Sequence, residues 1–180
     1  MLVGSESLAY NRELKMPILE GQSLDFQSHS PEQTIRIGVR LGELLKLSDL
    51  VCLAGDLGSG KTTLAQGIAR GWGTLDFVTS PSFIFINQYR RADQQTLYHV
   101  DAFRMEGVED AYLIGLHELI EDKAPIILEW PERIAKMLPS ERLWITMRWV
   151  DELRRGLQIA AFGLRYERML DHFRRSAFGG

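Results

Sequence analysis

The chain has 180 residues, which is enough for one domain with a single packed core. Hydrophobic residues make up 45% of the chain and charged residues 25%, an ordinary globular composition that excludes disordered and fibrous proteins. The formal net charge of −3 is too small to indicate nucleic-acid binding through bulk charge alone.

The sequence contains no recognisable segment for export or for crossing a membrane. Its single cysteine, Cys52, excludes an intrachain disulfide and a cysteine-based zinc site. Residues 1–22 lack the apolar core of a signal peptide, and no run of about 18 apolar residues occurs anywhere in the chain. We therefore expect a soluble cytoplasmic protein with no membrane contact, in which residues 1–22 form a flexible or loosely docked extension.

A short strand and a helix are predicted at the start of the domain. Residues 23–28 alternate between polar and apolar side chains, which indicates a strand. Ser30 then suits the N-cap of a helix, Pro31 its first position, and Gln33 completes a capping box. The apolar stripe of this helix comprises Ile37, Leu41, Leu44 and Leu45.

A phosphate-binding loop follows the next strand. Residues 50–54 form an uninterrupted apolar run, as expected of a strand covered on both faces, and they lead directly into GDLGSGKT at 55–62. This sequence matches G-x-x-x-x-G-K-[ST], in which glycines let backbone N–H groups face phosphate oxygens. Lys61 is expected to reach the β- and γ-phosphates, and the Thr62 hydroxyl to bind Mg²⁺. A helix begins near Lys61, and Gly71 is a credible C-terminal stop for it.

The remaining elements alternate between strands and helices. We predict strands at 83–89, 95–101 and 125–130, one or two short helices within 108–121 interrupted at Gly115, and a hairpin of 142–150 with 156–162. A closing amphipathic helix is indicated by Tyr166, Met169, Leu170 and Phe173. The predicted class is therefore α/β, with a P-loop NTPase-like mixed, largely parallel sheet flanked by helices. The domain would span 23–162, followed by a helix and tail at 163–180.

Two acidic residues end predicted strands, where ligand groups gather in open α/β sheets. We assign Glu129 to metal ligation, directly or through water, and Asp101 either to contact with the metal's ligands or to positioning of the attacking water, although the two roles could be exchanged. Residues 79–83 either contact the triphosphate or form an ordered turn, and Trp130 either packs over the site or lies in the core. The four histidines, His29, His99, His117 and His172, share no metal-ligand spacing, so none is assigned a catalytic role.

In combination, these segments resemble the TsaE (YjeE) family of P-loop ATPases. The residues that carry the resemblance are GDLGSGKTTL at 55–64, VTSPSF at 78–83, LYHVDAFR at 97–104, GLHELI at 115–120 and IILEWPERI at 126–134. The resemblance covers about residues 23–162. Ser82 replaces the usual threonine of the Ser-Pro-Thr segment, and Val100 to Arg104 replace the usual F-D-L-Y-R.

The resemblance implies an ATPase that works with the TsaD and TsaB proteins in tRNA threonylcarbamoyladenosine synthesis and meets tRNA indirectly, through that complex. It implies ATP and Mg²⁺ as cofactors, Lys61, Asp101 and Glu129 as catalytic residues, and Thr62 and Glu129 as metal ligands. The implied nucleotide-binding residues are Gly58, Ser59, Gly60, Lys61, Thr62, Thr63, Asp101 and Arg155. Arg155 is expected in the hairpin turn, with Arg154 as the alternative, and residues 30–34 are expected to border the adenine.

Other functions remain open from the residues alone. A small-molecule or nucleotide kinase could use the same loop, but such enzymes usually carry a mobile arginine-bearing lid, and no long insertion provides one. A nucleotide-gated binding module without hydrolysis is a third hypothesis. A GTPase is disfavoured because the chain has no N-K-x-D sequence. Residues 142–180 carry a net charge of +4, which permits tRNA contact but does not establish it.

Overall fold

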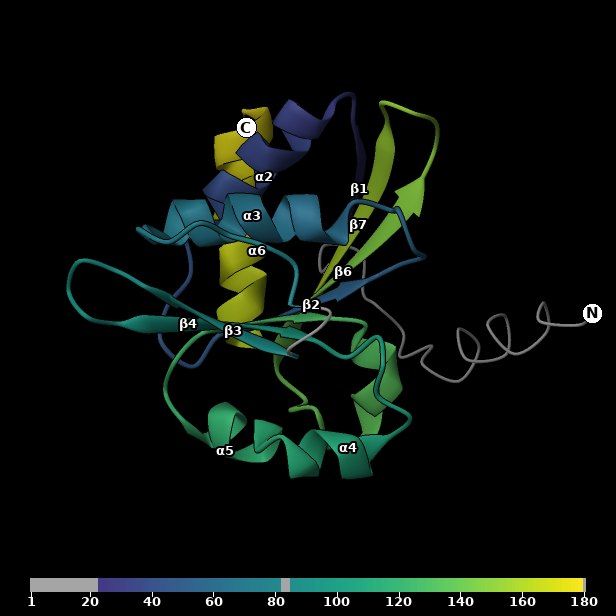
Figure 1. Ribbon diagram of the computed structural model, residues 1–180. Coiled ribbons are helices and arrows are strands. Elements are labelled where there is room, and N and C mark those ends of the chain that lie inside the picture. The colour runs from purple at the N-terminus through teal and green to yellow at the C-terminus, as the bar shows by residue number, and fades with distance from the viewer. Residues whose placement is uncertain (1–22, 82–84, 180) are drawn as a thin grey trace, which may run out of the picture.

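The computed structural model describes residues 23–81 and 85–179. Within these ranges the chain forms a seven-stranded sheet with the order β1-β7-β6-β2-β5-β4-β3 (Figure 1). The strands are β1 (Ser23–Ser28), β2 (Leu50–Ala54), β3 (Ile86–Arg90), β4 (Thr96–Asp101), β5 (Ile126–Glu129), β6 (Arg142–Trp149) and β7 (Arg155–Phe162). The helices are α2 (Pro31–Gly42), α3 (Lys61–Trp72), α4 (Val108–Leu113), α5 (Leu116–Glu121) and α6 (Leu164–Phe178), with a 3₁₀ segment, η1 (Pro131–Met137). The predictions for residues 1–22, Ser82 and Phe83 lie outside the described residues.

The sheet is mixed, and its four central strands are parallel. β2 pairs in parallel with both β5 and β6, and β4 pairs in parallel with β5. The outer pairings are antiparallel: β3 with β4 at one edge, and β7 with β6 and β1 at the other. The carboxyl ends of β2, β5 and β4 therefore meet at one edge of the sheet. The α/β class, the C-terminal hairpin and the closing helix are all confirmed.

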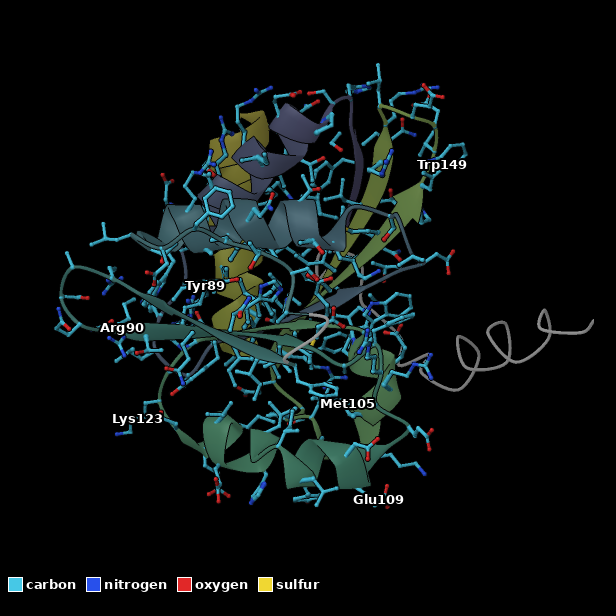
Figure 2. All side chains as sticks on the ribbon, in the orientation of Figure 1. Tyr89, Arg90, Met105, Glu109, Lys123 and Trp149 are labelled. Carbon is cyan, nitrogen blue, oxygen red and sulfur yellow. The ribbon has the colours of Figure 1, made fainter. Side chains whose placement is uncertain are left out.

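Helices cover both faces of this sheet (Figure 1). Val51 and Leu53 of β2 face a core shared with α2, α3 and α6, whereas Leu50 and Cys52 face a second core under α4, α5 and η1. Burial on both faces explains why β2 has no polar residue. Figure 2 shows the second layer from the side: Met105 lies toward the sheet, and the exposed Glu109 and Lys123 lie at the periphery.

The predicted start of α2 is confirmed, but the helix ends at Gly42, so Leu44 and Leu45 of the predicted stripe lie beyond its last residue. The Ser30 hydroxyl accepts a hydrogen bond from the Gln33 N–H at 3.1 Å, and Pro31 occupies the first turn. The Gln33 side chain reaches back 2.7 Å to the N–H of His29, one residue before the N-cap, so the capping box is closed one residue earlier than its usual form.

Helix α3 packs against α2 with its backbone, and this contact corrects the prediction for Gly71. The helix continues through Gly71 and ends at Trp72, followed by Gly73 in the left-handed conformation with φ +95°. A Cβ atom at Gly71 would lie 2.0 Å from the Val39 carbonyl oxygen of α2, and one at Gly42 would lie 2.0 Å from that of Ile68. Gly71 therefore permits close helix packing and does not end the helix.

The closing helix is tied to β2 by more than its apolar face. The predicted stripe of Tyr166, Met169, Leu170 and Phe173 is buried. The Tyr166 hydroxyl also accepts a hydrogen bond from the Leu50 N–H at 2.7 Å, and Arg165 forms a bidentate ion pair with the buried Asp49. Among the described residues no helix is long and apolar enough to span a bilayer.

Candidate functional site

The loop between β2 and α3 adopts a conformation that only glycine accepts readily. Gly55, Gly58 and Gly60 have φ values of +134°, +78° and +99°. Gly60 is the N-cap of α3 and provides no side-chain hydrogen bond to the first turn. The first N–H groups of a helix have no partner within it, so this end of α3 presents donors and the positive end of the helix dipole to an anion.

Lys61 is folded onto the loop that precedes it. Its ammonium group donates to the carbonyl oxygens of Gly55 (2.6 Å) and Asp56 (2.9 Å) and lies 3.9 Å from the centre of the Trp130 ring. The residue is only 5% exposed, and burial lowers the pKa of its amine, an effect opposed by the negative charges of Glu129 and Glu132. A polyphosphate would supply the negative charge that this desolvated ammonium lacks.

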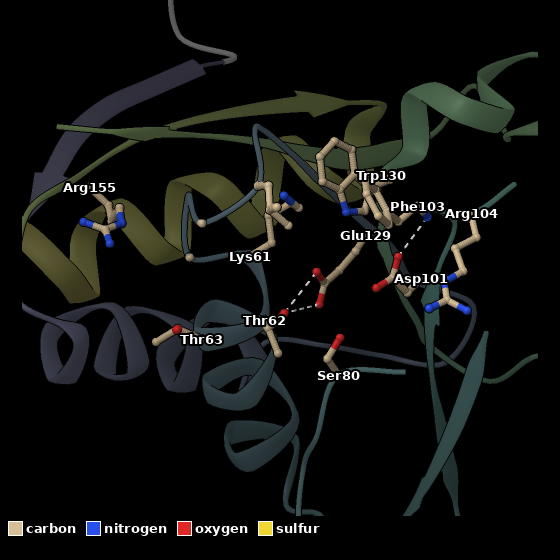
Figure 3. A pocket seen from close by; sticks show the side chains of 13 residues that line it. Lys61, Thr62, Thr63, Ser80, Asp101, Phe103, Arg104, Glu129, Trp130 and Arg155 are labelled. Carbon is tan, nitrogen blue, oxygen red and sulfur yellow. Dashed lines mark hydrogen bonds between the residues drawn. The ribbon is translucent and has the colours of Figure 1, made fainter. Parts of the chain in front are cut away.

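Thr62 and Glu129 meet across the site, although 67 residues separate them. The Thr62 hydroxyl lies 3.1 and 3.2 Å from the two carboxylate oxygens of Glu129 (Figure 3). Glu129 ends β5 and is 2% exposed. In the described part of the chain no three His, Cys, Asp or Glu side chains gather as a metal cage. One hydroxyl with one carboxylate is instead the kind of oxygen set that Mg²⁺ uses beside substrate phosphates.

Asp101 lies next to Glu129 in the sheet. The two residues are opposite each other in the parallel pairing of β4 with β5, and both are buried. One Asp101 oxygen accepts a hydrogen bond from the Phe103 N–H at 2.8 Å, which shapes the turn after β4. The carboxylate therefore has a local structural contact in addition to its position at the pocket.

These residues line one pocket of about 420 Å³, a size suited to a nucleotide. The predicted residues along it are Gly58, Gly60, Lys61, Thr62, Thr63, Asp101, Glu129 and Arg155. Figure 3 shows Thr63 and Arg155 toward one end, Asp101 and Arg104 toward the other, and Lys61 between them. Ser59 is the predicted residue that does not line the pocket. Its side chain is buried, and its hydroxyl has no hydrogen-bond partner.

Of the two candidate arginines, Arg155 lines the pocket and Arg154 does not. Arg155 is the first residue of β7 and lies just past the turn in which we expected it. Its guanidinium donates to the backbone carbonyls of Asp151 and Arg154, and its side chain reaches the pocket. Arg154 instead forms an exposed ion pair with Asp151. A small hollow beside Arg155 is bordered by Pro31 and Thr34, in the segment that was expected to border the adenine.

Sequence reasoning missed or left open several residues of the site. Trp130 lines the pocket and contacts Phe103 in a tilted arrangement with ring centres 4.9 Å apart. Its φ of +59° is a value that bulky residues rarely adopt. Both of its interpretations hold in part, because Trp130 lines the pocket and also packs against the second core. His99, which received no role, lies 2.9 Å from a Glu129 oxygen. The sequence did contain a signal that places His99 near the site. His99 and Asp101 are two residues apart in one strand, so their side chains lie on the same face of the sheet.

A glycine loop opening a helix at the carboxyl edge of a parallel sheet, with a lysine, a hydroxyl and a strand-end carboxylate around one pocket, defines a P-loop nucleotide-binding protein. The particular family follows from comparison with known proteins. The family model for the threonylcarbamoyl adenosine biosynthesis protein TsaE matches residues 28–157. The chain belongs to the TsaE family.

Individual relatives agree with this assignment. The tRNA threonylcarbamoyladenosine biosynthesis protein TsaE of Bacillus subtilis is 34% identical over 86% of this chain and 96% of its own length. The protein of the same name from Treponema pallidum is 35% identical over 74% of this chain and 97% of its own. The crystal structure of Bacillus subtilis YdiB superimposes with a TM-score of 0.73 at 32% identity, covering 86% of this chain and 95% of that one.

Proposed function

We propose that this protein is a Mg²⁺-dependent ATPase that acts in the synthesis of threonylcarbamoyladenosine on tRNA. Membership of the TsaE family supports the pathway, since the relatives bear that name. The observation that carries the ATPase assignment is the hydrogen bond between Thr62 of the phosphate loop and Glu129 of β5. It brings the two proposed metal ligands together at the N-terminus of α3.

Each residue has a defined task in this proposal. The N–H groups from Gly58 to Thr63 bind the phosphates, and Lys61 leaves its two carbonyl partners to neutralise the β- and γ-phosphates. Thr62 and Glu129 hold Mg²⁺, which when bound neutralises charge on the transferred phosphoryl group. Asp101 orients the attacking water from the neighbouring strand, and the exchange of roles between Asp101 and Glu129 stays open to test.

We further propose that turnover is slow in the isolated protein and is accelerated by the TsaD and TsaB proteins. P-loop catalysis is mainly positioning and charge neutralisation, so a partner surface can complete an unfinished site. The pocket has an open side, and Leu57 at its rim is 79% exposed. We propose no direct tRNA contact for this chain.

The test is ATP hydrolysis by the full chain, measured with and without TsaB and TsaD from the same source. Lys61→Ala is expected to abolish ATP binding, whereas Lys123→Ala, which removes an exposed lysine, is the matched control. Equal turnover with and without the partners would refute partner activation. If calorimetry detects no binding of any nucleoside triphosphate, alone or in the assembly, the ATPase proposal fails.

Two further outcomes would indicate the alternatives. Transfer of the γ-phosphate to a metabolite, with little release of inorganic phosphate, would indicate a kinase, which the family membership does not favour. A nucleotide-gated module predicts that Glu129→Ala supports tRNA modification in cells while Lys61→Ala does not. Loss of modification in both variants agrees with an ATPase.

A further inference from the structure

His99 joins the proposed metal ligand Glu129 to a buried chain of hydrogen bonds. The imidazole is fully buried in the sheet, and its Nε2 lies 2.9 Å from Oε1 of Glu129. An ionised carboxylate only accepts hydrogen bonds, so Nε2 carries the proton of this contact. Because Thr62 contacts Glu129 from the first turn of α3, the carboxylate is held from two directions.

The other ring nitrogen of His99 has its own partner. With the proton on Nε2, Nδ1 is an acceptor, and it lies 3.2 Å from the Tyr89 hydroxyl, whose single proton can go to Nδ1 or to the Thr79 carbonyl oxygen 2.8 Å away. Asn87 donates both to the Tyr89 hydroxyl and to the same carbonyl. The chain of contacts therefore runs from Glu129 through the strands to the segment at 78–81, of which Ser80 lines the pocket.

We propose that His99 is a positioning residue, which fixes the orientation of the Glu129 carboxylate toward Thr62 and thereby toward the cation. This inference rests on the proposed role of Glu129. A glutamate side chain has three rotatable bonds, and burial alone does not select one orientation of its carboxylate. The hydrogen bond from Nε2 makes that selection, and Tyr89 keeps the imidazole from rotating. Partners of this kind typically change metal affinity or activity by about 10- to 100-fold when removed.

A purely structural role predicts something different. A buried histidine needs hydrogen-bond partners wherever it lies, so any substitution could destabilise the fold without a specific effect on the cation. Two amide side chains separate the roles. The amide nitrogen of glutamine occupies about the place of Nε2, so His99→Gln keeps the donor to Glu129. The shorter asparagine places its nitrogen near Nδ1, so His99→Asn keeps the contact with Tyr89 and loses the one with Glu129.

The experiment compares these variants in the full chain with two readouts. The first is the affinity for a fluorescent ATP analogue with Mg²⁺ and with EDTA, whose ratio reports how much the cation contributes to binding. The second is kcat and KM for ATP in the hydrolysis assay above. We expect His99→Asn to lower the ratio and kcat by about 10-fold or more with KM changed by less than about 3-fold, and His99→Gln to stay within about 3-fold of wild type.

Thermal unfolding controls for stability, and Tyr89→Phe keeps the proposal testable if His99→Asn does not fold. This variant retains the aromatic ring and removes only the hydroxyl, so we expect a smaller loss in the same direction. A wild-type ratio and kcat in His99→Asn, or equal losses in His99→Asn and His99→Gln, would overturn the inference. If His99→Asn does not fold, the inference is overturned when Tyr89→Phe has the wild-type ratio of affinities with Mg²⁺ and with EDTA and the wild-type kcat. Wild-type protein that neither binds nor hydrolyses ATP would instead refute the proposed function itself.

Discussion

Replacing Gly71 by alanine tests whether the backbone contact between α2 and α3 holds the phosphate loop in place. The added Cβ would lie 2.0 Å from the Val39 carbonyl oxygen, whereas ordinary contact begins at about 3.4 Å. The two helices would have to separate by about 1.4 Å, because the position of a Cβ atom is set by the backbone and cannot rotate away.

Two effects of opposite sign compete in this variant. Alanine is favoured over glycine inside a helix by about 1 kcal/mol. Overpacking a tight contact costs about 1–3 kcal/mol, and here the upper part of that range applies because the opposing atom belongs to the backbone of another helix. We expect Gly71→Ala to lower the free energy of unfolding by about 2 kcal/mol, which for this chain length lowers Tm by about 4–8 °C.

The same displacement should reach the site, because α3 begins at Lys61. A shift of about 1 Å in a positioning element can reduce turnover about 100-fold, so kcat should fall more than stability alone would explain. Urea unfolding and ATP hydrolysis measure the two effects. Gly107→Ala is the control, since Gly107 has an extended φ of 179° and its added methyl would meet only the flexible Glu109 side chain. If Gly71→Ala is about 1 kcal/mol more stable than wild type, helix propensity dominates and the helices are not in tight contact.

Three further predictions concern single groups. Tyr166→Phe should leave the Leu50 N–H without its partner in the core and lower the free energy of unfolding by about 1–3 kcal/mol, measured by urea denaturation; an unchanged midpoint would show that the hydrogen bond contributes nothing. Burial lowers the pKa of Lys61 below 10.5, and the protonated amine binds phosphate, so ATP affinity should begin to fall at a lower alkaline pH than it would for an exposed lysine. Calorimetric titration across this range checks the shift, and affinity that stays constant up to the ordinary lysine pKa would contradict it. Burial raises the pKa of Cys52 to about 12, so its thiol should resist alkylation at pH 8 until urea unfolds the protein, and rapid labelling of the native state would refute its burial.

Local sequence was sufficient wherever the interacting groups are close in the chain. The phosphate loop was predictable because its glycines, Lys61 and Thr62 lie within eight consecutive residues. The cap of α2 was predictable for the same reason, since Ser30 and Gln33 are one helical turn apart. Glu129 and Asp101 required one more rule, that the carboxyl ends of parallel strands meet at one edge.

The sequence by itself thus determined the α/β class, the phosphate loop and the strand-end acids, because periodicity and short motifs encode local conformation. Only the tertiary structure decided the role of Gly71, which depends on how closely α2 approaches α3, and the partner of His99, which depends on the register of β4 against β5. Such contacts join residues that are far apart in the chain. Their distances are set by how helices and strands pack together, and no local pattern records that packing.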